Sequence, residues 1–557
     1  MSSMLDLAPE VLHQIFVHVY PTDLASLSMT CLYLSQVIKN DELLWKDQYL
    51  SLFDPPSQDG TASWKTRTTR VVNVQKILES DDDNVKNNDA ALQEVLETAI
   101  ELTEVSVSES PKNVDFLARY FKKASNLGAF LCKSSLFPRV APGRWTAAPT
   151  PSLRQLSAQL HVLGGMNLED PWPSMNALVC NHIASTVSSD EDDGDDEDSD
   201  GDGDEDGGDD IDDDDVNDND NDGADGVEFI EVDLVATDAV AVTSVPTAST
   251  TTTLSLLTTG IAANFSPQPI RFAHPYARSQ VYDLRRYTQA NMWGPFMDDG
   301  SGRVDWEKVQ AIMIVIGCNY RMYTERRGSA LSESGILRPW DEGFFGIAPG
   351  SYVSSPMSGG NLKPSLRPDL DALDPYGVTG SWMRIVCFLD FNDLYAFNFE
   401  SGPLDSTQDR PPLTTREAFR LIRLQLCVTS VEDPNPEDGD GDMPVVHFEG
   451  TSRSTFMAWD PNANSRIRGT VRKVASGAIR WTTFSIFNGD ERWRSEGVQI
   501  GGLRSARGIL GNWFDKNYDV HGPAGPTAFW KVSDDMIEER RNDPAVLQIL
   551  LAEAFGQ

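Results

Sequence analysis

The chain has little that points to catalysis or to metal chemistry. Its 557 residues include only six cysteines and seven histidines, and no two cysteines have the short spacing of a zinc site. It contains no glycine-rich phosphate loop followed by lysine, no His-Glu-x-x-His and no Gly-x-Ser-x-Gly. His447 and His521 are isolated, and Cys387 lies in an apolar run where burial makes a thiol a poor nucleophile. We therefore expect no enzyme activity, no metal site and no cofactor.

Long apolar segments and basic clusters are also missing. No run of about 18 apolar residues is present to span a membrane, and no apolar signal segment stands at the amino terminus. The net charge of −39 argues against a nucleic-acid partner. Since the cysteines are scattered as well, we expect a soluble protein of the cytosol or nucleus with no membrane partner.

Most of the excess negative charge lies in one segment. Residues 188–226 contain 23 Asp or Glu and no Lys or Arg. Such a segment repels itself and buries no apolar surface, so we expect residues 187–262, including a Thr/Ser-rich stretch, to be a disordered insertion. The acidic residues from Asp202 onward resemble the start of a calcium loop, but Asp213 stands where such a loop needs a bidentate glutamate. A low-complexity acidic tract is the favoured interpretation.

Residues 1–50 have more apolar residues than a small module can bury. Val11, Leu12 and Ile15 follow helical spacing, and Pro9 suits the first turn of that helix. Pro21 begins a second predicted helix, and Asn40-Asp41 begins a third. A module of this size is near the lower limit for an independent core. The remaining apolar face therefore predicts a surface for a partner.

The same residues carry a recognisable series of short elements. In order these are Leu7, Pro9-Glu10-Val11-Leu12, Ile15-Phe16, Pro21-Thr22-Asp23-Leu24, Cys31-Leu32 and Leu44-Trp45-Lys46. The series resembles the F-box, with Ala8 in place of the usual proline. This resemblance implies docking on a Skp-type adaptor within a cullin-RING ubiquitin ligase. The adaptor contacts that it implies are Leu7, Pro9, Leu12, Ile15, Pro21, Leu24 and Trp45, some of which must instead form the small core of the module.

The rest of the chain divides by its periodicity. Apolar residues three or four apart predict a helical linker over residues 51–135. Strand-like runs with Gly, Pro and Asp turns predict a β domain that begins in residues 136–186 and continues through residues 263–534. Within it, VQAIMIVIGCNYRMY is interpreted as a strand and residues 414–426 as a helix, and residues 535–557 are expected to form a C-terminal helix. The expected fold is multidomain α+β, with a three-helix N-terminal module and a mostly antiparallel barrel or sandwich.

The β domain has a resemblance of its own. Its matching pieces include Glu491-Arg492-Trp493, Glu496-Gly497-Val498-Gln499, Gly501-Gly502, Gly511-Asn512-Trp513 and Phe529-Trp530-Lys531. They are similar to the C-terminal half of a family of fungal F-box proteins, and to the substrate-binding barrel of the animal F-box protein that targets cyclin D. Aromatic walls with hydrogen-bonding groups suit a peptide end or a degron side chain. The candidate target-binding residues are Arg492, Trp493, Gln499, Arg504, Trp513 and Trp530, although a structural role in packing is favoured for Gly501, Gly502 and Trp530.

Together these features predict a non-catalytic substrate receptor of a cullin-RING ubiquitin ligase. Its N-terminal helices would bind the adaptor, and its β domain would bind an unidentified target protein. One alternative is a lipocalin-like sensor whose barrel binds a small ligand, which a deep apolar cavity would favour. Another is an acidic histone-binding or chaperone-type protein that acts through residues 188–226.

Overall fold

The computed structural model describes residues 7–56, 62–104, 112–143, 145–166, 230–231, 269–327, 340, 343–352, 362–363, 368–400, 402, 405, 408–455 and 464–537. Of the predicted insertion over residues 187–262, only the two-residue strand β1 (Ile230–Glu231) is described. The predicted C-terminal helix lies outside the described residues beyond Ile537. Strand β11 (Met536–Ile537) pairs there with β2 (Leu362–Lys363).

The N-terminal module contains four helices rather than the three expected. They are α1 (Pro9–Phe16), α2 (Pro21–Ser28), α3 (Leu32–Asn40) and α4 (Glu42–Leu52). The predicted second helix is interrupted before Leu32, because Cys31 is extended and its sulfur caps a new helix by accepting a hydrogen bond from the Leu34 amide. Asp41 caps α4 as expected, with 2.9 Å between its Oδ1 and the Leu44 amide nitrogen.

A helical region follows the module and extends further than predicted. Its elements are α5 (Trp64–Glu79), α6 (Asp83–Lys86), α7 (Asp89–Thr103), α8 (Lys112–Phe121), α9 (Ala124–Asn126), η2 (Leu127–Leu131), α10 (Leu136–Val140) and α11 (Pro151–Gly164). The expectation that strands begin in residues 136–186 is wrong for the described part, because α10 and α11 are helices. Thr150 caps α11, and Pro151 occupies its first turn, where a missing N–H costs nothing.

Two further helices cover the barrel from one side. They are α14 (Pro269–Val281) and α15 (Trp306–Arg327), joined through the short η4 (Leu284–Arg286). The stretch from Val309 was expected to be a strand, and this prediction is wrong. Val309 and residues 311–316 are buried on all sides of α15, so the helix shows no amphipathic period that distinguishes it from a buried strand.

Eight antiparallel strands close into a barrel, as the sequence predicts. They are β3 (Gly380–Phe388), β4 (Ala418–Glu432), β5 (Val445–Ser454), β6 (Asn464–Lys473), β7 (Ile479–Phe487), β8 (Asp490–Gln499), β9 (Ile509–Asp515) and β10 (Ala524–Ser533). Each strand pairs with the next along the chain, and β10 pairs with β3 to close the ring. Residues 414–426 were expected to be helical, but they lead into β4, whose residues alternate between the two faces of the wall.

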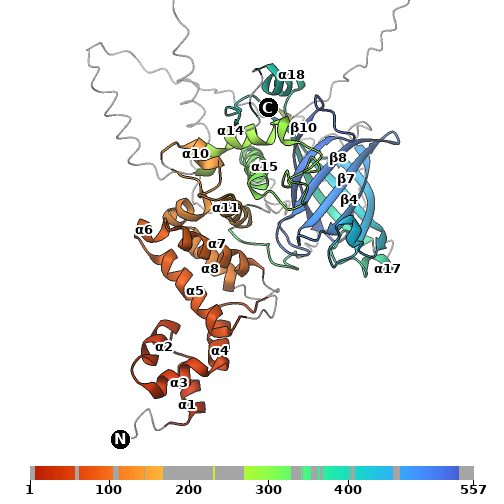
Figure 1. Cartoon of the computed structure of the whole chain (residues 1–557). Helices are drawn as coiled ribbons and strands as arrows, with labels where there is room; N and C mark the ends of the chain where they lie inside the picture. Colours follow the sequence, from red (N-terminus) through yellow and green to blue (C-terminus); the bar gives the residue numbers. More distant parts are fainter. Residues whose placement is uncertain are drawn as a thin grey trace, which may run out of the picture.

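The barrel has two ends, visible above and below the strands in Figure 1. We call them the α18 end, where β3 finishes before α18 (Phe391–Tyr395), and the α17 end, where β3 begins after α17 (Pro368–Asp371). The outward faces of β3, β9 and β10 join α7, α11 and α15 in one apolar core that also contains Met383, Leu510 and Trp530. The helical region is thus packed directly on the barrel wall.

Candidate functional site

The predicted adaptor contacts divide between the interior and the surface of the N-terminal module. Leu12, Leu24 and Trp45 form its core with Phe16, Leu34, Ile38 and Leu44. Pro21 is also buried, and Leu7 is half-buried against the same core. Only Pro9 and Ile15 of the seven are exposed. Most of the predicted set therefore supports the module from within.

Six apolar side chains remain exposed on this module, and we refer to them together as its apolar surface. Its members, with their exposed fractions, are Val11 (46%), Ile15 (40%), Met29 (80%), Leu32 (83%), Tyr33 (38%) and Leu43 (60%). Val11 and Ile15 are one turn apart and share a face of α1. The sequence suggested this surface through helical spacing on α1, but it did not separate Leu43 from its buried neighbours Leu44 and Trp45. Apolar exposure of this extent marks an interaction site.

Polar side chains of α4 hold α1 in place beneath that surface. Gln48 is buried, and its Nε2 donates to the carbonyl oxygens of Phe16, Val17 and Val19 at 2.7, 2.9 and 2.9 Å. His13 lies 2.8 Å from an Asp41 oxygen and 3.1 Å from an Asp47 oxygen. The hydrogen bond to Asp41 is the main reason that the pKa of His13 is raised above its usual 6.5. These contacts fix the angle at which α1 presents Val11 and Ile15.

The six candidate target-binding residues do not form one site. Arg492, Trp493 and Trp513 lie at the α18 end, whereas Gln499 and Arg504 lie at the α17 end. Trp530 faces outward from β10 and packs on Trp340, with 5.4 Å between ring centroids, so its predicted place in a pocket is corrected to the buried core. Gly501 is structural, since its φ of 84° favours glycine and a Cβ there would meet the Ile347 carbonyl.

The α18 end combines two half-buried tryptophans with an unpaired arginine. Trp493 and Trp513 make an edge-to-face contact at 5.3 Å. Arg492 stacks on Trp493 at 5.0 Å, and no carboxylate of the described residues pairs with it. The register of β7 and β8 skips one residue between Trp493 and Glu491, so Arg492 is the extra residue of a bulge. The bulge turns this side chain away from the regular ladder.

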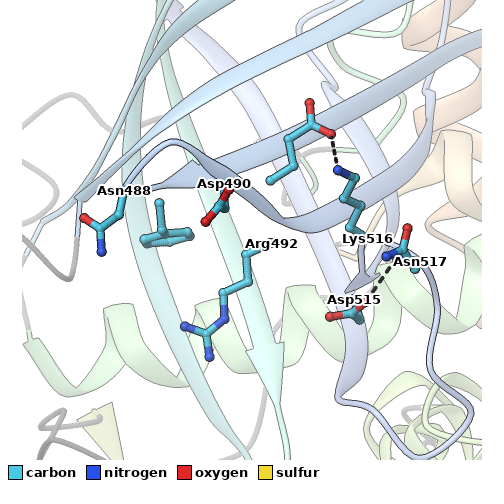
Figure 2. A pocket seen from close by; sticks show the side chains of 8 residues that line it. Asn488, Asp490, Arg492, Asp515, Lys516 and Asn517 are labelled. Carbon is cyan, nitrogen blue, oxygen red and sulfur yellow. Dashed lines mark hydrogen bonds and ion pairs between the residues drawn. The ribbon is translucent and has the colours of Figure 1, made fainter.

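A cavity of about 350 Å³ lies beside this bulge, between the β7–β8 turn and the end of β9. Its lining is polar: besides Phe487 it comprises Asn488, Asp490, Glu491, Arg492, Asp515, Lys516 and Asn517. Lys516 is 3.0 Å from Glu491, and Figure 2 shows the Arg492 guanidinium pointing away from that ion pair. The arginine is therefore available to an external acceptor.

The α17 end carries a second cavity, of about 460 Å³. Its polar groups are already engaged within the protein. Arg504 donates to the carbonyl oxygens of Asp374 and Pro375, and Lys531 donates to the Gly377 carbonyl and pairs with Asp534. Gln499 is buried and donates to the Gly502 carbonyl at 2.6 Å. Because these polar groups already have partners within the protein, the α18 end is the better candidate for binding.

Groups that would support chemistry are not assembled in the described residues. These residues contain no cluster of three or more His, Cys, Asp or Glu able to hold a metal ion. Cys387 is buried, and burial raises the pKa of its thiol well above the usual value, as its apolar run predicts. The Asp-rich run at Asp202 lies outside the described residues. No helix in the described part of the chain is long and apolar enough to cross a membrane.

Comparison with known families places the N-terminal module in a class. Residues 5–51 match the family model of the F-box-like domain. Searches of curated proteins and of solved structures found no match to this chain. The chain thus carries an F-box-like domain on α1 to α4, which supports a general role in binding the adaptor of a ubiquitin ligase. The helical region and the barrel are described by their own geometry.

Proposed function

We propose that this protein is a non-catalytic substrate receptor of a cullin-RING ubiquitin ligase in the cytosol or nucleus. The observation that carries the proposal is the uncovered apolar surface on an F-box-like domain. A Skp-type adaptor would cover that surface and connect the chain to the cullin-RING scaffold. The barrel, held on the helical region by a shared core, would present a target protein.

In this proposal the protein accelerates ubiquitin transfer by position alone. A target held on the barrel is kept near the charged ubiquitin carrier, which raises its effective concentration without any side-chain chemistry. The rigid packing of α15 on β9 and β10 supports such a role, because it fixes the barrel relative to the helices. We place the target at the α18 end, where Arg492, Trp493 and Trp513 gather.

The two alternatives depend on different parts of the chain. A lipocalin-like sensor needs a deep apolar cavity, but the α17 half of the barrel is filled by Trp382, Trp481 and Phe529, and neither cavity described above has a predominantly apolar lining. An acidic histone-binding protein would act through residues 188–226, which lie outside the described residues. Deleting that tract would abolish partner binding under the acidic alternative, whereas our proposal expects adaptor and target binding to persist.

The adaptor role is tested by charging the exposed face of α1. Val11→Asp with Ile15→Asp places two carboxylates in an apolar interface, so we expect co-purification with a Skp-type adaptor to fall at least tenfold. Leu12 is unsuitable for this test because it is fully buried, and a charge there would unfold the module.

Gln14→Asp is the matched control, since Gln14 is an exposed polar residue of the same helix. It should leave co-purification unchanged, and circular dichroism should show equal helix content in all variants. Unchanged adaptor binding by the Val11/Ile15 variant would contradict the proposal.

The target is sought by mass spectrometry of proteins captured on the intact chain. Arg492→Ala and Trp493→Ala should each reduce target capture several-fold while adaptor binding persists. Lys516→Ala, from the same cavity, is the control. A chain lacking residues 1–50 should retain the target and lose the adaptor. Loss of both partners in that deletion would mean that the barrel is not an independent target-binding surface.

A further inference from the structure

The interior of the barrel changes character along its axis. Toward the α17 end, Trp481 contacts Trp382, Phe448 and Phe529 at ring-centroid distances of 5.4 to 5.6 Å and forms an aromatic layer across the lumen. Toward the α18 end, the inward positions include Val386 and Arg420, and six of them carry hydroxyl side chains. These are Ser452, Ser454, Thr483, Ser485, Ser495 and Thr527. The interior of the barrel is thus filled by aromatic rings toward the α17 end and carries hydroxyl side chains toward the α18 end.

A charged residue is buried where the two halves meet. Arg384 of β3 lies opposite Ile422 and Phe529 in the sheet register, so its side chain points inward, and only 4% of the residue is exposed. Its Nε donates to Thr527 Oγ1 at 3.1 Å, and Thr527 in turn donates to the Ile385 carbonyl. Thr527 is one step nearer the α18 end, so the guanidinium is directed into the polar half.

Arg384 differs from the buried Arg278 and Arg410 in having no acidic partner among the described residues. Arg278 pairs with Glu417 at 3.1 Å, and Arg410 pairs with Asp283 at 3.1 Å. Among the described residues no carboxylate pairs with Arg384, and the two outer nitrogens of its guanidinium make no hydrogen bond. Burial alone lowers the pKa of Arg384 to about 10, so the group stays charged near neutral pH. A buried charge without a counter-charge is costly, and an external anion would supply the missing charge.

We propose that Arg384 is an anion-binding residue that receives a carboxylate or phosphoryl group of the target through the polar half of the barrel. This inference rests on the proposed function and names the chemical class of the group recognised. The planar guanidinium presents two parallel donors that fit a carboxylate or a phosphate. Trp493 and Trp513 would flank the residues that enter behind the anion.

The test uses the full chain and two small probes, inorganic phosphate and acetate, each titrated at constant ionic strength against chloride. An anion that binds only the folded state raises the melting temperature with its concentration. We expect a rise of about 2–4 °C at high probe concentration for the wild-type chain. A response to phosphate alone identifies a phosphorylated target, and a response to acetate identifies a carboxylate. No response to either probe beyond that to chloride would overturn the proposal.

Arg384→Met separates anion binding from a structural role. Because it removes an uncompensated buried charge, this variant should melt at or above the wild-type temperature without probe and should show no anion response. Arg466→Met is the control, since Arg466 lies on the outer wall with 70% of its side chain exposed, and it should keep the wild-type response. A lower melting temperature for Arg384→Met without probe would assign the arginine a structural role and overturn the proposal.

A capture experiment distinguishes failure of this inference from failure of the proposed function. Arg384→Met should lose at least tenfold of the target and keep the adaptor. Retention of target by this variant would overturn the inference and leave the receptor proposal standing. If the wild-type chain captures no target at all, the receptor proposal fails, and the anion titration still decides the role of Arg384.

Discussion

At the scale of single residues, long-range side-chain hydrogen bonds decide how the first helix is held. Gln48 satisfies three carbonyl groups at the end of α1 from a position about 30 residues later in the chain. The side-chain amides of Asn126 in the helical region and of Asn398 beside the barrel also donate hydrogen bonds to backbone carbonyl groups. A carbonyl left without a donor in such a place costs about 1–3 kcal/mol. These residues therefore act as connectors between elements.

His13 makes the N-terminal module sensitive to pH. Its pKa is raised above 6.5, mainly by the hydrogen bond to Asp41, so the folded state binds a proton more tightly than the unfolded state does. The stabilisation is complete below pH 6.5 and is lost as the pH rises through the raised value. We expect hydrogen exchange of the α1 amides to accelerate as the pH rises through that range, after correction for intrinsic exchange.

His13→Gln provides the control for this prediction. Glutamine keeps a donor beside Asp41 and Asp47 but does not titrate, so the corrected protection of α1 should become independent of pH. A wild-type chain whose protection did not change between pH 6 and pH 8 would contradict the assignment.

The sequence predicted features that depend on neighbouring residues better than features that depend on contacts between distant elements. The cap at Asp41 and the helix start at Pro9 were predicted correctly because both depend on residues within one turn. The sequence left open which of the adaptor-contact candidates are buried, among them Leu12, Leu24 and Trp45, and it did not predict the connection through Gln48, since both depend on how four helices meet. Arg384 was not among the predicted site residues. Its lack of a counter-charge appears only when the barrel is closed.

At the scale of elements, the alternation of residues identified strands well, whereas the burial of α15 on every side made this helix look like a strand. The strand-like runs of the β domain were recognised, and β7 shows the alternation of buried and half-buried residues that such a run implies. The helix α15 was mistaken for a strand because it is covered on every side by α11, α14 and the barrel wall. The strand β4 was mistaken for a helix at its start, where polar residues interrupt the alternation. Hydrophobic periodicity does not identify an element when the elements packed around it, rather than its own sequence pattern, determine which of its residues are exposed.

The aromatic layer is the element that holds the barrel closed from within. Trp481→Ala removes the ring that contacts Trp382, Phe448 and Phe529, and it leaves a cavity that its neighbours do not fill. We expect the free energy of unfolding to fall by about 3–5 kcal/mol. Chemical denaturation followed by far-ultraviolet circular dichroism measures this loss.

Trp493→Ala is the comparison for that prediction, because Trp493 is only half-buried at the α18 end. It should cost clearly less stability than Trp481→Ala. Equal losses in the two variants would mean that the aromatic layer is not the centre of the barrel core.

At the scale of the whole molecule, the barrel and the helices are joined by a buried polar cluster. Glu417 lies just before β4 and accepts hydrogen bonds from Tyr282 of the α14–η4 connection and from Asn319 of α15. It also pairs with Arg278 of α14 at 3.1 Å. Three segments distant in sequence therefore meet at one carboxylate beside the barrel wall. The cluster fixes the barrel on its helical support.

Removing the Glu417 carboxylate should weaken the attachment of the barrel to the helices. Glu417→Ala leaves the buried Arg278 uncompensated, and we expect a loss of about 3–5 kcal/mol in the free energy of unfolding. Limited proteolysis should then cut between α15 and the barrel more rapidly. Glu449→Ala breaks an exposed pair with Arg466 and should cost less than about 1 kcal/mol. Similar losses in both variants would argue against a joining role for Glu417.

The pairing of β10 with β3 has a consequence for synthesis of the protein. The ring joins its first strand to its last, so a chain emerging from the ribosome cannot complete it until Ser533 has been made. Until then two strand edges stay open to neighbouring molecules. A premature stop before Ala524 would therefore turn the barrel into an aggregation-prone open sheet, while α1 to α4 folded normally.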